Sequence, residues 1–393
     1  MPPIAITAYT ATTAAGLGRG ALAQALFEGR SALAPCRFET ATLETWIGTV
    51  DGLEVAALRD DLTAWDCRNH RLAQLGLEQD GFAAAVAAAR ERYGPGRVGV
   101  FLGTSTAGIL ETEVAYRARD PASGALPAAL DYRRTHNSFA LADFVRARLG
   151  LSGPAAAVCT ACSSSAKVFG MAQRMLGAGL VDAAVVGGVD SLCLTTLYGF
   201  HSLQLLAARA CRPFDRRREG LSIGEAAGFM LLEAGRPGPL ALLGVGESSD
   251  AHHMSAPCPD GSGARAAMAA ALAAAGLAPA AVDYLNLHGT ATAANDAAEA
   301  QAINALFDAT LVCNSTKGVT GHALGAAGAV EAVVAALALE HQRLPASCGT
   351  VEVTPELRAD YRIASAAHPL RVVMSNSFGF GGSNCALLIG GAA

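Results

Sequence analysis

Short apolar runs alternate along the chain with longer stretches rich in alanine. Four apolar runs end in Gly, Ser or Thr, as buried strands do when a tight turn follows: residues 97–105, 182–192, 282–290 and 371–382. Three alanine-rich stretches are long enough for helices that pack through small side chains: residues 264–277, 296–307 and 325–340. Because strands that alternate with helices form layered sheets, the pattern predicts an α/β fold.

Two of the predicted strands end in similar sequences, "VFLGTST" at 100–106 and "NLHGTAT" at 286–292. Weak similarity of this kind also arises by chance, but it is expected of an internal duplication. Pro and Gly interrupt the pattern in "EAGRPGPLALLG" at 233–244, which marks a natural seam. We therefore predict two related halves, residues 1–240 and residues 241–393.

Composition and charge narrow the possible partners. The chain has 393 residues, of which 52% are hydrophobic and 16% charged, as expected of a compact globule with a large core. The formal net charge of −5 argues against nucleic acid, so an acidic partner would need a local basic patch. The candidates are Arg68 with Arg71, and Arg216 with Arg217; the alternative is that both groups are merely solvated.

Nothing in the sequence indicates membrane insertion or secretion. The most apolar segment, "GHALGAAGAVEAVVAALALEH", contains Glu331 and Glu340, whereas a membrane span needs roughly 18 uninterrupted apolar residues. No basic residue precedes Arg19, unlike the start of a secretory signal. The ten cysteines are scattered, mostly in apolar runs, which favours reduced thiols. We expect a soluble, cytoplasmic protein.

The stretch "AVCTACSSSAKVF" (157–169) places Cys159 and Cys162 three residues apart. With ten cysteines this redox-like spacing arises readily by chance, and a zinc site would need about four ligands, for which no second motif exists; we therefore predict no metal. A strand, a tight turn and a helix would instead put Cys162 at a helix N-terminus, where the dipole favours a nucleophilic thiolate. A buried structural cysteine fits this stretch equally well.

Two histidine motifs favour the interpretation of Cys162 as a nucleophile over that of a structural cysteine. His288 lies in "NLHGTATAAND", and His322 follows Lys317 by five residues in "STKGVTGHALGAAGAVEA". A single histidine is more often a core or surface residue. Because Cys162, His288 and His322 all fall at predicted strand ends or loop-to-helix junctions, a shared site is the better explanation.

The segments "TACSSS", "HGTAT", "STKGVTGHALGAAGAVEA" and "SNSFGFGGSN" resemble, in this order, the hallmark motifs of the elongating β-ketoacyl-acyl carrier protein synthases. "SSDAHHMSAP" and "CRPFDRRREGLSIGEAAG" resemble further segments, so the resemblance covers nearly the whole chain. It implies a thiolase-like, layered αβαβα fold with internal duplication. It also implies a homodimer, or a heterodimer with a chain-length-factor-like homologue.

The resemblance further implies a decarboxylative Claisen condensation. Cys162 matches the nucleophile that accepts an acyl group, and the backbone amides of Cys162 and Phe380 match the oxyanion hole. His288 and His322 match the histidines that donate hydrogen bonds to the thioester of malonyl-acyl carrier protein, which suits neutral imidazoles. Substrates would arrive on the phosphopantetheine arm of the carrier, so no cofactor is expected.

Other residues receive supporting roles from the same resemblance. Lys317 matches the lysine near the second histidine, where it could take part in catalysis or, as we favour, support the site through an ion pair with Glu331. Phe380 is expected to form an aromatic gate. Asp250, Asp296, Thr290 and Thr292 are expected to order the site, and Thr106 to line the acyl pocket. Arg68, Arg71, Arg216 and Arg217 are weak candidates for docking the carrier protein.

The sequence leaves the pathway and two other classes open. "CTAC" departs from the commoner "STAC", and "LTTLYGFHSLQLL" resembles ketosynthases of pigment-type polyene pathways, so the product could be a fatty acid, a polyketide or a polyene. A non-catalytic chain-length factor would lack Cys162. A non-decarboxylating thiolase uses a second cysteine, for which Cys385 is the candidate, but His322 occupies the deciding position. Neither Gly-x-Ser-x-Gly nor Gly-x-Gly-x-x-Gly in a suitable context is present.

Overall fold

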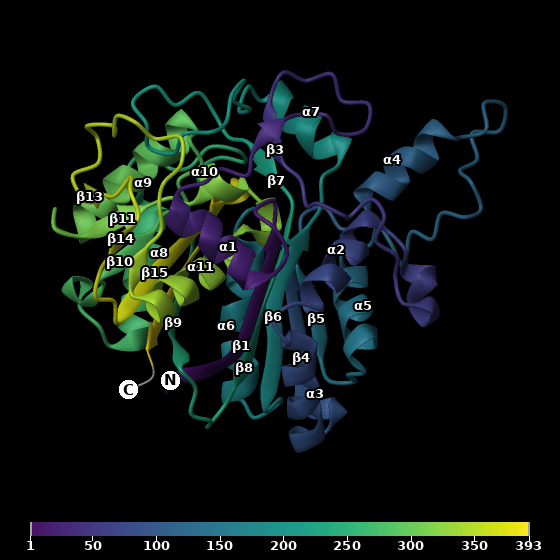
Figure 1. Cartoon of the computed structure of the whole chain (residues 1–393), viewed down its shortest axis with the longest axis horizontal. Helices are drawn as coiled ribbons and strands as arrows, with labels where there is room; N and C mark the ends of the chain where they lie inside the picture. Colours follow the sequence, from purple (N-terminus) through teal and green to yellow (C-terminus); the bar gives the residue numbers. More distant parts are fainter. Residues whose placement is uncertain (1, 392–393) are drawn as a thin grey trace.

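The computed structural model describes residues 2–391, and its largest sheet has eleven strands in two consecutive halves (Figure 1). In sheet order, the first half contains β5 (Ala155–Val158), β4 (Val98–Gly103), β6 (Ala183–Asp190), β8 (Ala226–Glu233) and β1 (Ile4–Thr13). The second half continues with β9 (Leu240–Ser249), β16 (Ser383–Gly391), β15 (Val372–Gly379), β10 (Tyr284–Asn286), β11 (Val312–Asn314) and β13 (Asp360–Tyr361).

The two halves repeat one topology. In the first half β4 runs parallel to β5 and β6, and β8 runs antiparallel to β6 and β1. In the second half β10 runs parallel to β11 and β15, and β16 runs antiparallel to β15 and β9. The similar sequences "VFLGTST" and "NLHGTAT" lie at the ends of β4 and β10, which are counterparts. The predicted internal duplication is therefore confirmed.

Helices form three layers around the two halves of the sheet. The central helices α6 (Ser164–Gly177) and α11 (Ala327–His341) each contact strands of both halves. The outer helices α2 (Arg68–Leu77), α3 (Phe82–Tyr93) and α5 (Phe139–Leu149) pack on the first half. On the second half α8 (Ser262–Ala275) packs on β9 and β16, with α9 (Ala293–Leu306) beside it. These layers give the expected αβαβα arrangement.

Small residues allow the central helices to approach closely. A Cβ atom at Gly328 of α11 would lie 2.8 Å from Ala166 of α6, which is closer than side-chain carbons pack. Among the described residues, one segment, Leu324–His341, is long and apolar enough to span a membrane. Within the fold, 89% of its residues are buried. This helix is a core element, which supports a soluble protein.

Candidate functional site

The duplication brings the three predicted site residues together. Cys162 follows β5 and His322 follows β11, which are counterparts, and His288 follows β10. The sulfur of Cys162 and one nitrogen of each histidine lie within 4.8 Å of one another. The two imidazole rings are 5.2 Å apart and nearly perpendicular. All three side chains are buried, so residues far apart in sequence face one cavity.

A tight turn between β5 and α6 presents Cys162. The preceding residue, Ala161, has a φ of 51°, a left-handed conformation that is unfavourable for alanine and is common where a structure fixes a functional residue. Serines hold this turn: Ser163 donates to the carbonyl of Thr160, and Ser164 donates to the carbonyl of Ala161. The serines that follow the cysteine therefore have structural roles.

The ionisation state of Cys162 differs from the sequence-based expectation. Burial raises the pKa of the thiol to about 12, although the Lys317 ammonium and the backbone N–H of Phe380 act in the opposite direction. The cysteine does lie two residues before the first residue of α6. However, loss of hydration outweighs the helix terminus. The prediction of a resting thiolate is therefore wrong, and the thiol must lose its proton during attack.

The two histidines are neutral. Burial, reinforced by the Lys317 cation, lowers the pKa of His288 and of His322 well below the usual value. Lys317 Nζ lies 3.4 Å from His288 Nδ1, and an ammonium can only donate, so Nδ1 accepts and the ring proton lies on Nε2. The backbone N–H of His322 donates to the carbonyl of Ser222 at 2.8 Å. Both rings are therefore neutral imidazoles, and within residues 2–391 the buried His322 Nδ1 has no hydrogen-bond partner.

Lys317 connects His288 to a buried carboxylate. Its ammonium donates to the backbone carbonyl of His288 and to Glu331, forming the expected ion pair. The side chains of Lys317 and Glu331 are only 2% and 4% exposed. Burial raises the pKa of Glu331 to about 7, against the influence of Lys317. This contact pattern assigns Lys317 a positioning role at His288.

We predict that Lys317→Met destabilises the protein, because the buried Glu331 carboxylate would either stay charged without a partner or have to take up a proton. Loss of one member of a buried ion pair typically costs about 3–5 kcal/mol. The free energy of unfolding from chemical denaturation measures the effect. The double variant Lys317→Met/Glu331→Gln should recover most of the loss, since it leaves no unpaired charge. Equal stability of the single variant and the wild type would contradict the ion pair.

The site residues face a cavity of about 70 Å³. Pockets for drug-sized ligands measure roughly 300–1,000 Å³, so this space admits a reacting group and no long chain. Thr290 and Thr292 line it, and their hydroxyl oxygens are 2.9 Å apart. Phe380 also lines it, and its ring packs 5.6 Å from that of Phe200 in α7 (Leu194–Ser202). Phe380 therefore lines the same cavity as Cys162, and its role as a gate stays a prediction.

Asp250 fixes the turn that carries Phe380. Its carboxylate accepts a hydrogen bond from Asn384 at 2.6 Å, and its backbone N–H donates to the carbonyl of Gly382 at 2.9 Å. Gly381 and Gly382 have φ values of 79° and 73°, which glycine adopts without strain. Asp250 also lines the cavity, consistent with the expected supporting role.

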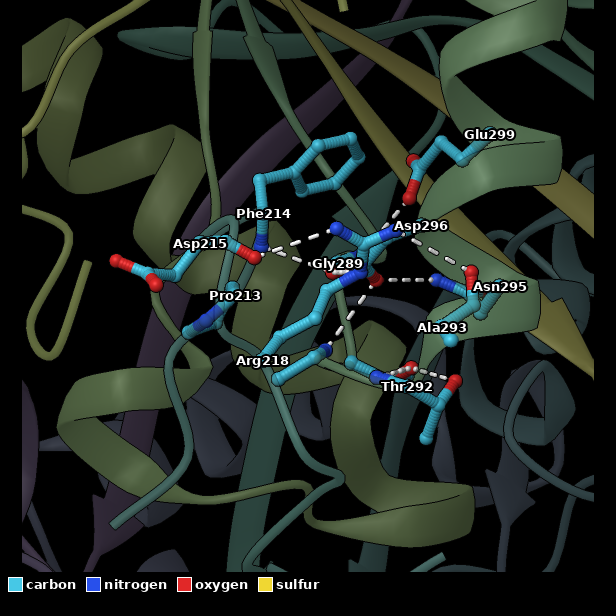
Figure 2. A network of polar contacts seen from close by, with 12 residues as sticks. Pro213, Phe214, Asp215, Arg218, Gly289, Thr292, Ala293, Asn295, Asp296 and Glu299 are labelled. Atoms are coloured by element: carbon cyan, nitrogen blue, oxygen red, sulfur yellow. Dashed lines mark hydrogen bonds and ion pairs between the residues drawn. The ribbon is translucent and has the colours of Figure 1, made fainter. Parts of the chain in front are cut away.

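Asp296 orders a neighbouring loop from the start of α9 (Figure 2). Its carboxylate accepts from the backbone N–H groups of Phe214 at 2.8 Å and Ala291 at 3.2 Å, and lies 3.7 Å from the guanidinium of Arg218. Because Ala291 lies between Thr290 and Thr292, these contacts hold the segment that lines the cavity.

Glu299 was not predicted from the sequence. Its carboxylate accepts from the backbone N–H groups of His288 at 2.9 Å and Gly289 at 2.8 Å. Burial raises its pKa to about 7. The available signal was its place one helical turn after Asp296 in a predicted helix, since residues three apart share a face.

Thr106 does not line the described cavity. Its hydroxyl is 2.9 Å from Asp190, to which it donates, and the side chain is buried. Its role in an acyl pocket stays a prediction.

Most of the arginines expected to dock the carrier protein form ion pairs within the chain. Arg68 is wrong as a docking residue, because its side chain is only 7% exposed and pairs with the buried Glu225. Arg71 pairs with Asp66, and Arg216 pairs with Glu352 on the surface. Arg217 is exposed and has no ion pair within residues 2–391.

Cys162, His288 and His322 also form a set of three potential metal ligands. A histidine that binds a metal normally donates its other ring N–H to an acceptor. His288 has the reverse arrangement, because Nδ1 accepts from Lys317 and Nε2 carries the proton. The ammonium would also repel a bound cation. The donor set therefore fits a nucleophile with two hydrogen-bond donors better than a metal centre.

Known proteins are similar to this chain in sequence and in fold. Residues 1–236 match the family described as beta-ketoacyl synthase, N-terminal domain, and residues 241–350 match beta-ketoacyl synthase, C-terminal domain. A mitochondrial 3-oxoacyl-[acyl-carrier-protein] synthase of Arabidopsis thaliana is 40% identical over 62% of this chain and 58% of its own length. The 3-oxoacyl-[acyl-carrier-protein] synthase 2 of Vibrio cholerae is 38% identical over 61% of this chain and 63% of its own length. The chain thus spans less than two thirds of these curated relatives.

A solved ketosynthase from Xenorhabdus doucetiae, in complex with its chain length factor, resembles the chain over almost its full length. It is 40% identical, covers 99% of this chain and 98% of its own, and superposes with a TM-score of 0.90. The two family matches together cover residues 1–236 and 241–350, which include Cys162, His288 and His322. This chain belongs to the β-ketoacyl synthase family.

Proposed function

We propose that the protein extends acyl chains by decarboxylative Claisen condensation. An acyl thioester on Cys162 would condense with malonyl-acyl carrier protein to give a β-ketoacyl-acyl carrier protein. The observation that carries the proposal is the convergence of a buried thiol and two neutral imidazoles on one cavity. Relatives named 3-oxoacyl-[acyl-carrier-protein] synthases support the reaction class.

In the first half-reaction, the Cys162 sulfur attacks the carbonyl carbon of an acyl thioester on the carrier. The new carbon–sulfur bond forms as the bond to the carrier sulfur breaks, and the thiol proton ends on the departing carrier thiol. Backbone N–H groups of Cys162 and Phe380 would stabilise the transient oxyanion, and one such donor is worth about 3 kcal/mol. The Phe380 N–H already faces the sulfur.

In the second half-reaction, His288 and His322 would donate hydrogen bonds to the thioester carbonyl of malonyl-acyl carrier protein. Carbon dioxide leaves, and the electrons of the broken carbon–carbon bond form an enolate. The enolate carbon attacks the acyl group on Cys162, and the cysteine leaves as a thiolate that takes up one proton from solvent. Neutral donors suit this step because they stabilise the enolate oxygen. Loss of the carboxylate generates the carbanion, so the proposal requires no cofactor.

An extension assay tests this function. The protein is incubated with acyl- and malonyl-loaded carrier protein over a panel of acyl lengths, and the carrier is analysed by intact mass. We expect a β-ketoacyl carrier that is two carbons longer than the acyl donor. The proposal would be overturned if none of the acyl donors in the panel were extended.

We further propose a dimer, either of two copies or with a chain-length-factor-like homologue, in the cytoplasm. β5 is an edge strand, and open edges pair readily with another strand. The carbonyl of Pro154 accepts a hydrogen bond from Val100 in β4, and the carbonyl of Val158 accepts one from Thr104, directly after β4. Because strand groups alternate in direction, the N–H and carbonyl of Ala157 point to the open edge. The Xenorhabdus relative was solved with its chain length factor.

Ala157→Pro should disrupt this dimer, because proline removes the outward N–H without removing a hydrogen bond to β4. Sedimentation of the protein alone, and mixed with a candidate partner, would measure assembly. The control Ala157→Val keeps the N–H and should assemble as the wild type does. Unchanged assembly of Ala157→Pro would contradict pairing through β5.

A further inference from the structure

Asp190, the last residue of β6, is a buried carboxylate beside the site that neither half-reaction uses. The side chain is 1% exposed and forms no ion pair within residues 2–391. Burial raises its pKa, and hydrogen bonds from neighbouring groups oppose the shift. A buried carboxylate without a cationic partner is costly unless hydrogen bonds replace its hydration. The groups that donate hydrogen bonds to Asp190 therefore show which segments it stabilises.

One oxygen of Asp190 accepts hydrogen bonds from the loop after β4. Its Oδ1 accepts from the Thr104 hydroxyl at 2.7 Å, from the Ser105 N–H at 2.7 Å, and from the Thr106 N–H and hydroxyl at 2.9 Å each. This loop also reaches the nucleophile turn, because the Ser105 hydroxyl lies 3.4 Å from the carbonyl of Ala161, to which it donates. Oδ1 therefore anchors the segment next to Cys162.

The other oxygen holds the turn that follows His322. Asp190 Oδ2 accepts from the N–H of Gly325 at 2.5 Å. A Cβ atom at Gly325 would lie 2.5 Å from Ser105 Oγ and 2.8 Å from Asp190 Oδ2, so the two loops touch where only glycine fits. Leu324, just before it, has a φ of 49°, a strained conformation that persists only when its surroundings hold it.

We propose that Asp190 is a positioning residue that sets the separation of Cys162 and His322, with one carboxylate oxygen on the nucleophile side and the other on the His322 side. The role rests on the proposed function, in which only the second half-reaction needs His322. A displacement of about 1 Å in such a site can cost roughly a hundredfold in rate. Loss of the Gly325 contact should therefore slow extension more than acylation.

Asp190→Asn tests this directly, because it preserves shape. The amide oxygen can still accept from the loop after β4, whereas the amide NH2 group would face the Gly325 N–H as a second donor. The rate of acylation and the single-turnover rate of extension are measured on the folded, full-length variant. We expect extension to fall by about a hundredfold, with acylation within a few-fold of the wild type. The matched control Thr104→Val removes one donor on the other oxygen and should retain both rates.

Several results would overturn the role of Asp190. These are wild-type rates in Asp190→Asn, an equal fall of both half-reactions, or an extension-selective loss in Thr104→Val as large as that in Asp190→Asn. Should Asp190→Asn fail to fold, Gly325→Ala pushes the same turn away without altering the carboxylate, and must show the same selective loss. A wild-type protein inactive in both half-reactions would reject the proposed function instead.

Discussion

Replacing Cys162 with alanine is expected to abolish transfer of an acyl group to the protein. Within residues 2–391, Cys162 is the one cysteine whose sulfur lies with both imidazoles at the cavity, and alanine has no atom that can form the thioester. Intact-mass analysis after incubation with an acyl-loaded carrier protein measures the adduct. The wild type should gain one acyl group and Cys162→Ala none.

Two other cysteines provide matched controls. Cys159 is exposed three residues earlier in the chain, and Cys385 lies buried within β16. Cys385 is the residue that a thiolase mechanism would require, but it does not line the cavity. Cys159→Ala and Cys385→Ala should therefore keep the adduct. An acyl group retained by Cys162→Ala would reject the nucleophile.

Replacing His322 with alanine is expected to preserve acylation and abolish most extension. The variant keeps the thiol and both backbone amides, but loses a hydrogen-bond donor to the malonyl thioester. Removal of one such donor typically lowers the rate by about 10²–10³-fold. The protein is loaded with acyl groups, mixed with malonyl-acyl carrier protein, and followed over a single turnover.

His322→Asn is the informative companion, since an amide N–H can replace part of the lost hydrogen bond. It should extend faster than His322→Ala and more slowly than the wild type. Extension by His322→Ala at the wild-type rate would contradict the assignment of His322 to the second half-reaction. Loss of acylation in the same variant would contradict it equally.

The sequence predicted where the site lies because its markers are local. An apolar run placed His288 at a predicted strand end, and loop-to-helix junctions placed Cys162 and His322. Parallel strands bring such positions to one edge of a sheet. The boundaries were less accurate. The strand expected over 282–290 is only Tyr284–Asn286, because the following residues turn into the site.

Properties that depend on distant contacts could not be predicted. Desolvation of Cys162 comes from the assembled core, so a helix N-terminus alone suggested a thiolate that burial prevents. Arg68 looked free because its partner, Glu225, lies 157 residues away. Glu299 and Asp190 serve as acceptors for backbone N–H groups of other loops, and no local pattern specifies which donors will meet a carboxylate.

The most direct measurement follows one acyl group through both half-reactions at residue resolution. The acyl-loaded wild-type protein is digested and mapped by tandem mass spectrometry before and after addition of malonyl-acyl carrier protein. We predict that the acyl group is found on Cys162 alone, and then appears on the carrier as a β-ketoacyl group two carbons longer. An acyl group on another cysteine, or one that stays on Cys162 after the addition, would contradict a condensing site built from Cys162, His288 and His322.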